Sequence, residues 1–206
     1  MTFWHRLAQQ FRQPAGFLGR LAGLFFRINR EGIEWTIEQL EIQPADHVLE
    51  IGFGPGYGIQ RVAGLASQGR VAGVDFSETM LQQATRRNAA AIAAGKVEVQ
   101  LVDASTLPYP DNSFHKVFGT NVVYFWKEPA ATLQEIRRVM KPGGRLALYV
   151  ISKEDIAKFK VTQTGVYRLY SGDELAGLLT QAGFHQARFV IRPERHRTGI
   201  CGIGEK

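Results

Sequence analysis

A glycine-rich turn is the feature of this sequence with the clearest chemical use. Residues 48–58 read VLEIGFGPGYG, so an apolar strand pattern ends near a carboxylate and glycine then stands at every second position. Glycine lets the backbone turn with positive φ and lets a ligand approach where a Cβ would block it. Ligands of open α/β sheets bind where a strand passes into a helix. We therefore expect this turn to border a ligand, through Glu50, Gly52, Gly54 and Gly56.

Polar residues end three further strand-like runs. Asp75 follows Gly56 by 19 residues, at a place where a carboxylate can accept hydrogen bonds from both hydroxyls of a ribose. Asp103 and Ala104 end the third run, where a carboxylate can accept from an adenine amino group, and Asn121 borders the cleft after the fourth. Each residue alone also fits a turn or a helix cap. Their order along the chain favours an adenine nucleoside lying across the crevice.

Two adenine-containing ligands fit this arrangement. A nicotinamide dinucleotide would use the pattern G-x-G-x-x-G, which seats a pyrophosphate at a helix N-terminus. Counting from Gly52 places Tyr57 at the third glycine position, and counting from Gly54 places Ile59 there. S-adenosylmethionine has no phosphate, and its methionine tail carries an ammonium group that a carboxylate such as Glu50 would suit. The missing third glycine disfavours the dinucleotide.

The elements that position these residues alternate between strand and helix patterns. Apolar runs typical of buried parallel strands stand at 47–51, 70–75, 97–102, 114–120 and 144–151. Helical patterns stand at 57–67, 78–94 and 129–140, and a capping-box pattern at 171–174 begins another helix that ends near residue 183. Runs at 184–192 and 198–204 predict a terminal hairpin. This order predicts a three-layer α/β fold with an added antiparallel edge.

The chain also resembles a known family through five motifs. They are VLEIGFGPGYG at 48–58, GVDFSETM at 73–80, VDAS at 102–105, LPYPDNSF at 107–114 and RVMKPGGRL at 138–146. Through them the chain resembles the class I S-adenosylmethionine-dependent methyltransferases, and within these the methyltransferase type 11 subgroup, which includes ubiquinone and menaquinone C-methyltransferases. The resemblance covers residues 45–152 and implies a Rossmann-like, seven-stranded, mostly parallel sheet with an antiparallel last strand. It also implies S-adenosylmethionine as cofactor.

The resemblance implies a role for each cofactor residue. Glu50 and the glycines of the turn bind the methionine end, and Tyr57, at a variable position of the motif, is expected to close over it. Asp75 binds the ribose, and Asn121 closes the cleft. The residues expected around the adenine are Phe76, Met80, Asp103 and Ala104.

The acceptor is less defined by the sequence. Tyr124 and Trp126 follow the fourth strand and either line an apolar acceptor pocket or only pack the next helix, while Arg168 lies in a loop that could reach the rim. Methyl transfer is an in-line displacement that needs mainly alignment, and no residue stands out as a base. The sequence therefore predicts methyl transfer to a small, apolar or aromatic molecule. The alternatives are a methyltransferase fold that binds the cofactor without catalysis, and a nicotinamide-dependent oxidoreductase.

The N-terminal residues 1–42 are expected to form a helical cap on a cofactor-binding domain at 43–206. Apolar residues recur at helical spacing across this segment, and its first thirty residues hold five arginines and no acid, against a net charge of +6 for the chain. A lid over the cleft and a helix lying on a membrane surface both fit this composition. Nucleic acid is not an expected partner, because the segment lacks lysines and any recognisable RNA-binding module.

The remaining composition excludes several classes of protein. A single cysteine, Cys201, allows no disulfide within the chain and no cysteine cluster for a metal, and no histidine pair has metal-ligand spacing, so no metal is expected. No apolar run is long enough to span a membrane, and the N-terminus lacks the pattern of a signal peptide. A cytoplasmic location is the expectation.

Overall fold

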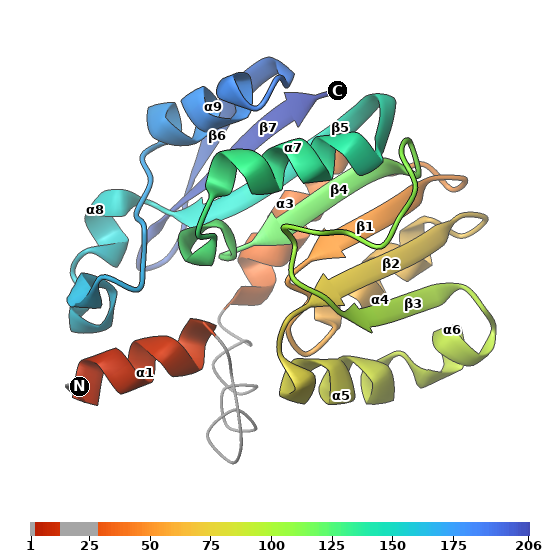
Figure 1. Ribbon diagram of the computed structural model, residues 1–206, viewed down its shortest axis with the longest axis horizontal. Coiled ribbons are helices and arrows are strands. Elements are labelled where there is room, and N and C mark those ends of the chain that lie inside the picture. Colours follow the sequence, from red (N-terminus) through yellow and green to blue (C-terminus); the bar gives the residue numbers. More distant parts are fainter. Residues whose placement is uncertain (1–2, 13–28) are drawn as a thin grey trace.

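A computed structural model shows a three-layer α/β fold built on one seven-stranded sheet (Figure 1). It describes residues 3–12 and 29–206. The strand order is β3-β2-β1-β4-β5-β7-β6, and β7 is antiparallel to both its neighbours while the pairs among β1 to β5 are parallel. The strands are β1 His47–Ile51, β2 Arg70–Asp75, β3 Val97–Leu101, β4 Phe114–Thr120, β5 Met140–Ile151, β6 His185–Pro193 and β7 Thr198–Glu205. The predicted fold class and the antiparallel last strand are confirmed.

Helices cover both faces of the sheet. Helices α3, α4 and α5 pack on one face in one apolar cluster, and α7 and α9 pack on the other face in a second cluster. The near-continuous apolar strands are thus buried on both sides, as parallel sheets require. The α-helices are α1 Phe3–Arg12, α3 Arg30–Leu40, α4 Tyr57–Leu65, α5 Glu78–Arg87, α6 Ala89–Ala93, α7 Pro129–Val139, α8 Lys153–Ile156 and α9 Gly172–Gln181, with short 3-10 helices η2 Val123–Phe125 and η3 Lys160–Thr164.

The helix expected over 78–94 is interrupted. Ser77 caps α5, accepting a hydrogen bond from the Met80 N–H at 3.4 Å. The helix then ends at Asn88, whose Nδ2 donates to the carbonyl oxygens of Ala84 and Gly56. Asn88 thereby ties the end of α5 to the glycine turn.

Strand β5 begins at Met140, earlier than the predicted start at 144. Met140 pairs with Phe114 of β4, and a register shift follows between Phe114 and Lys116. The backbone of Gly143 and Gly144 exchanges hydrogen bonds with Lys206. The KPGG segment at 141–144 is therefore an irregular stretch between the pairs Met140–Phe114 and Arg145–Lys116, with Gly143 at φ +72°, and the backbone of Lys206 holds it. The capping box at Ser171 and Glu174 is present as predicted.

Helix α3 belongs to the layer that covers the sheet. Its residues Trp35, Ile37 and Leu40 are buried in the core, and a Cβ on Gly32 would lie 2.9 Å from Cζ of Tyr149 in β5. The boundary expected after residue 42 places α3 in the cap, whereas the structure packs it on β4 and β5. The residues expected to extend a helix across 13–28 lie outside the described part of the chain.

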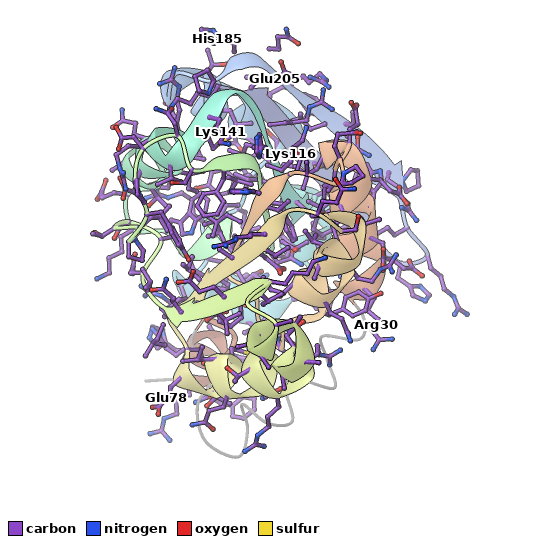
Figure 2. The ribbon with its side chains drawn as sticks, turned by 90° about the vertical axis from the view of Figure 1, so that its right-hand side faces the viewer. Arg30, Glu78, Lys116, Lys141, His185 and Glu205 are labelled. Carbon is purple, nitrogen blue, oxygen red and sulfur yellow. The ribbon has the colours of Figure 1, made fainter. Side chains whose placement is uncertain are left out.

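The carboxyl ends of the parallel strands lie at one end of the sheet, and labelled side chains mark the two ends (Figure 2). Arg30, at the start of α3, and Glu78, at the start of α5, lie toward the end where β1 and β2 finish (Figure 2). Lys116 and Lys141 lie toward the opposite end. Because β1, β2, β3 and β4 are parallel, their carboxyl ends meet at one edge, and the expected ligand residues gather there.

Candidate functional site

A cavity of about 500 Å³ lies at the carboxyl ends of β1, β2 and β4, beside the loop that follows β3. A smaller cavity, of about 50 Å³, adjoins it beneath the glycine turn. Asn29, Gly52, Gly54 and Thr120 line both. The expected cofactor residues in the wall of the larger cavity are Gly52, Gly54, Asp75, Phe76, Met80, Asp103, Ala104 and Asn121. Glu50 and Tyr57 line the smaller one, and Gly56 is among the lining residues of neither.

The glycines of the turn serve its packing as well as its conformation. Gly52 has φ +70°, and a Cβ there would lie 2.3 Å from Cγ1 of Val122. Gly56 has φ +79°, and a Cβ there would lie 2.8 Å from Cα of Ala84 in α5. A side chain at either position would meet both backbone strain and a clash. The turn is thus wedged between α5 and the loop after β4.

Glu50 is a buried carboxyl group with one oxygen unsatisfied. It is 2% exposed, and burial raises the pKa of Glu50 well above its usual range, against a hydrogen bond from the Ile59 backbone. Oε1 packs closely against Gly58, where an added Cβ would lie only 2.3 Å from it. Oε2 has no hydrogen-bond partner among the described residues. A buried acceptor without a partner is costly unless a ligand supplies a donor. An ammonium group in the smaller cavity would supply one.

Asp75 organises the turn through both of its oxygens. Oδ2 accepts from the Gly54 N–H and Oδ1 from the Ser77 N–H, each at 2.9 Å. Burial raises the pKa of Asp75 to about 6, although backbone hydrogen bonds from Ser77, Gly54 and Phe76 oppose the shift. Each carboxylate oxygen has a second lone pair. Asp75 can therefore hold the turn and still accept a hydrogen bond from a ligand in the cavity.

The far wall of the cavity has an apolar face and a charged edge. Phe76 and the fully buried Met80 supply apolar surface. Oδ1 of Asp103 accepts from the Ser105 N–H at 2.9 Å. Burial raises the pKa of Asp103, but the bonds from Ser105 and the positive charges of Lys127 and Arg12 outweigh it, so the net pKa is lowered. Asp103 therefore stays an acceptor at neutral pH.

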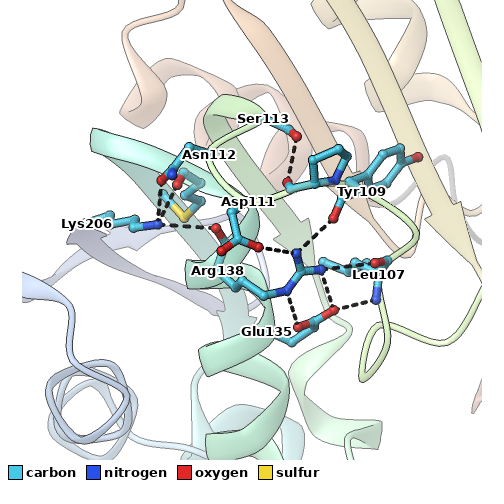
Figure 3. A network of polar contacts seen from close by, with 10 residues as sticks. Leu107, Tyr109, Asp111, Asn112, Ser113, Glu135, Arg138 and Lys206 are labelled. Atoms are coloured by element: carbon cyan, nitrogen blue, oxygen red, sulfur yellow. Dashed lines mark hydrogen bonds and ion pairs between the residues drawn. The ribbon is translucent and has the colours of Figure 1, made fainter.

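The loop before β4 is clamped by an arginine of α7 (Figure 3). Nη1 of Arg138 donates to the Tyr109 carbonyl at 2.9 Å and to Asp111 at 2.7 Å, and Nη2 donates to the Leu107 carbonyl at 3.1 Å. The carboxylate of Glu135 accepts hydrogen bonds from Nε and Nη2 of Arg138, each at 2.8 Å, and a third from the Leu107 N–H. Since this loop continues from Asp103, the clamp fixes that side of the cavity.

Tyr57 is engaged by helix α3. Its hydroxyl donates to Glu34, which also pairs with Arg61 at 2.6 Å, and the guanidinium of Arg30 lies 4.8 Å from its ring centroid. Arg30 and Arg87 line the smaller cavity together with Glu50. This cavity therefore presents a carboxyl group and two guanidinium groups, which complement a zwitterion.

The expected acceptor residues divide into two groups. Tyr124 and Trp126 line the cavity, and Tyr124 is buried, its hydroxyl accepting from the Ile151 N–H at 2.6 Å. Arg168 is not among the lining residues; its backbone N–H donates to the Tyr124 carbonyl at 3.0 Å, and the neighbouring Tyr167 lines the cavity instead. Asn121, between Thr120 and the η2 helix, has φ +57° and lines the cavity rim.

Several lining residues were not selected from the sequence. Arg12, Asn29, Ile156 and Tyr167 come from segments outside the five motifs, before β1 or after β5. No local pattern marks them, because only packing of α1, α3, α8 and the following loop brings them to the cavity. Among residues 3–12 and 29–206, no cluster of three His, Cys, Asp or Glu is placed to hold a metal. In the same part of the chain, no helix has the length and apolarity to cross a bilayer.

Comparison with known proteins agrees with this geometry. The family model described as "Methyltransferase domain" matches residues 49–148. An uncharacterised methyltransferase of Bacillus subtilis (strain 168) is 29% identical over 175 residues, 84% of this chain and 90% of that protein. A demethylmenaquinone methyltransferase of Symbiobacterium thermophilum is 38% identical over 121 residues, 57% of this chain and 47% of that protein. The chain thus spans about half the length of the latter relative.

A solved structure extends the match over the whole fold. The crystal structure of an S-adenosylmethionine-dependent methyltransferase from Aquifex aeolicus superposes with a TM-score of 0.72 at 22% identity, covering 98% of this chain and 99% of that one. At this identity the likeness shows the fold, and the matched domain and the relatives identify residues 49–148 as a methyltransferase domain. The chain therefore carries a methyltransferase domain on the fold of the S-adenosylmethionine-dependent methyltransferases.

Proposed function

We propose that this enzyme methylates a small, apolar or aromatic molecule that enters the larger cavity beside the cofactor. The observation that carries this proposal is the aromatic wall opposite the cofactor residues. It is formed by Tyr124, Phe125, Trp126 and Tyr167, with Ile156 beside them. A concave apolar wall with few polar groups is typical of sites for small apolar ligands.

The charges around the two cavities support one placement of the cofactor. The ammonium of the methionine end would meet the unsatisfied Oε2 of Glu50, and its carboxylate would meet Arg30 or Arg87. The ribose would meet Asp75, and the adenine would lie against the apolar surface of Phe76 and Met80 with its edge toward Asp103. The expected residue roles are thus supported by position, and each remains part of the proposal.

The chain's own contribution to the reaction is alignment and exclusion of water. When bound, S-adenosylmethionine supplies an electrophilic methyl group on a sulfonium. The hydroxyl of Tyr124 is occupied by Ile151, and burial raises the pKa of Tyr124 well above its usual range. Phe125 and Trp126 offer no proton acceptor. Alignment alone is worth about 7–11 kcal/mol in favourable cases, so we infer an acceptor that ionises readily, such as a phenol or enol.

Two other activities are less well supported. A nicotinamide-dependent oxidoreductase would need a pyrophosphate site, whereas Tyr57 stands at the third glycine position and is engaged by Glu34. A cofactor-binding protein without catalysis would have no use for an open aromatic wall next to the methionine end.

The N-terminal residues are proposed to complete the acceptor side as a cap. Helix α1 packs against η3, and Arg12 at its end lines the larger cavity. At its other end Phe3 and Trp4 are exposed, at 71% and 41%. Aromatic and basic residues on one helix suit the surface of an anionic membrane, so peripheral membrane contact stays part of the proposal. No nucleic-acid partner is proposed.

Calorimetry and a methyl-transfer assay test the function in sequence. S-adenosylmethionine and S-adenosylhomocysteine should bind, and NAD should not. Labelled cofactor should then transfer its methyl group to members of a panel of phenols, enols and quinols. Trp126→Ala should lower turnover while leaving the affinity for S-adenosylhomocysteine within about twofold, whereas Leu65→Ala, at an exposed position of α4, serves as an apolar control outside both cavities. Tight NAD binding, or cofactor binding with no transfer to any class of acceptor, would contradict the proposal.

A further inference from the structure

Asn29 occupies the junction of the two cavities. It stands immediately before α3, outside the matched domain, and lines both the larger and the smaller cavity. The other residues shared by the two cavities are Gly52, Gly54 and Thr120, of which only the threonine carries a polar side chain. Asn29 is therefore one of two polar side chains at the place where a ligand would pass from one cavity into the other.

The carboxamide of Asn29 is held from the opposite end of the chain. Nη1 of Arg197 donates to Oδ1 of Asn29 at 3.2 Å, across a separation of 168 residues. Nε of Arg197 lies 2.5 Å from Oε2 of Glu194. Oε1 of Glu194 in turn accepts from the hydroxyl of Tyr149 at 2.8 Å. A chain of polar contacts thus runs from strand β5, through the β6–β7 turn, to Asn29.

The residues of this chain of contacts are buried and closely packed. The side chains of Arg197 and Glu194 are 15% and 4% exposed, and Tyr149 is fully buried. A Cβ on Gly199 would lie 2.7 Å from the Tyr149 ring and 2.9 Å from Oε1 of Glu194, so glycine at this position permits the contact. Buried charged partners with satisfied hydrogen bonds keep one geometry, because leaving either charge alone is costly. Arg197 therefore presents a fixed donor to Asn29.

The hydrogen bond to Oδ1 of Asn29 also determines the role of its NH2 group, Nδ2. An asparagine side chain has one acceptor oxygen and one NH2 group with two donors. Since Oδ1 accepts from Arg197, the amide assignment is set and Nδ2 is the group left to donate. Among the described residues, Nδ2 of Asn29 has no hydrogen-bond partner. A donor at the junction suits an oxygen of the ligand.

We propose that Asn29 is a cofactor-contacting residue, donating from Nδ2 to S-adenosylmethionine, and that Arg197, Glu194 and Tyr149 are its positioning residues. The inference rests on the proposed placement of the cofactor's methionine end in the smaller cavity. It assigns a function to the β6–β7 turn, which orients a ligand contact contributed by the segment before α3.

The variant Asn29→Asp tests the Nδ2 donor without disturbing the position of the side chain. The aspartate keeps an oxygen for Arg197 and nearly the same shape, but it has no N–H to donate. Its affinity for S-adenosylhomocysteine, measured by calorimetry, should fall about tenfold, which corresponds to about 1.4 kcal/mol, and Asn29→Ala should show a similar loss. The melting temperature of Asn29→Asp should stay near that of the wild type. Wild-type affinity in both variants would overturn the proposal.

The positioning role of Arg197 is tested by comparing single and double variants of Arg197 and Asn29. Arg197→Lys keeps a positive charge toward Glu194 but replaces the planar fork that reaches Asn29. It should weaken S-adenosylhomocysteine binding about as much as Asn29→Ala, and the double variant should be no weaker than either single variant. Arg195→Ala, at an exposed position of the same turn, is the matched control and should bind normally. Fully additive losses would overturn the positioning role. If the wild type itself failed to bind S-adenosylhomocysteine, the proposed function would fail instead.

Discussion

At the scale of single residues, the site depends on two buried carboxyl groups with different tasks. Glu50, which lines the smaller cavity, has one buried oxygen without a hydrogen-bond partner among the described residues, whereas both oxygens of Asp75 already accept backbone hydrogen bonds. Burial raises the pKa of both groups. In each case the folded protein without ligand holds the proton more tightly than the unfolded chain does. Ligand binding and pH are therefore linked through these residues.

Glu50 is expected to release a proton when the cofactor binds. An ammonium next to Oε2 favours the carboxylate, against the burial that raises its pKa in the free protein. Calorimetry at pH 7 with S-adenosylhomocysteine, in buffers with different ionisation enthalpies, should show net proton release by the wild type. Glu50→Gln should bind more weakly and lose that buffer dependence. Glu34→Gln, at a carboxylate bound to Tyr57 and Arg61, is the control. Equal proton release by the wild type and Glu50→Gln would refute the assignment.

Asp75 is expected to affect both stability and cofactor affinity. Because its folded pKa, about 6, lies above the usual 3.8, the unfolding free energy should fall as pH rises through this window. The fall due to this one group is about 2–3 kcal/mol. In Asp75→Asn, the free energy of unfolding measured by denaturant titration should differ less between pH 4.5 and pH 7 than it does in the wild type.

The same variant tests the ribose contact. The wild type should bind adenosine more tightly than 2′-deoxyadenosine, and Asp75→Asn should reduce that preference while weakening S-adenosylhomocysteine binding by roughly two orders of magnitude, since two bonds to a charged group are lost. An unchanged preference would leave Asp75 only its structural task of holding Gly54 and Ser77.

At the scale of elements, the loops at the cavity are held by helices packed on the sheet. The clamp formed by Arg138 joins α7 to the loop that continues from Asp103, and Asn88 joins the end of α5 to the glycine turn. These bonds bridge backbone carbonyls, so the loops keep one conformation without forming regular structure themselves. The cavity shape thus depends on α7, which does not line it, as well as on α5, which contributes Met80 to its wall.

Replacing Arg138 by lysine should loosen the loop. A lysine keeps the charge but loses the fork that reaches Leu107, Tyr109 and Glu135 together. We expect the free energy of unfolding to fall by about 1–3 kcal/mol and the affinity for S-adenosylhomocysteine to fall severalfold. Denaturant titration and calorimetry measure the two effects. Arg137→Lys is the matched control, because Nε of Arg137 donates to the Gly183 carbonyl, away from this loop. Equal behaviour of the two variants would show that the clamp is dispensable.

At the scale of the whole molecule, the segment before β1 has two parts with different relations to the domain. Helix α3 buries Trp35, Ile37 and Leu40 against the sheet, whereas α1 contacts η3 and reaches the cavity only through Arg12. The area buried by α3 contributes to folding, since each fully buried large apolar side chain stabilises by about 1.5–3 kcal/mol. The contact of α1 with η3 is expected to serve the acceptor side instead.

Two truncations separate these tasks. A chain beginning at residue 29 should fold, bind S-adenosylhomocysteine and lose most turnover, because α3 and Asn29 remain while the cap is gone. A chain beginning at residue 43 should be strongly destabilised in thermal melts. Flotation with vesicles of phosphatidylcholine and phosphatidylserine tests the membrane reading on the full chain. Normal turnover by the chain from residue 29, combined with lost vesicle binding, would replace the cap by a membrane-binding role.

The order of strands and helices was predictable from the sequence, and most of the predicted cofactor residues line one of the two cavities. Each of those signals is local: a strand, a turn and a helix N-terminus lie next to one another in the chain, and the carboxyl ends of parallel strands meet at one edge. Glu50, Asp75 and Asp103 could therefore be selected as a set. The early start of β5 and the break at Asn88 were missed, because they depend on pairing with Phe114 and Lys206 and on a bond to Gly56.

Other parts of the cavity wall became visible only in the folded protein. Tyr167 replaces Arg168 in the cavity wall, and Arg12 reaches the wall from the first helix. Asn29 is fixed by a residue 168 positions away. Contacts of this kind arise from packing between segments distant in sequence, and they leave no periodic pattern or motif in either segment. Tyr124 and Trp126 could be named from the sequence, but these other parts of the wall arise from long-range contacts and are therefore recognisable only in the folded protein.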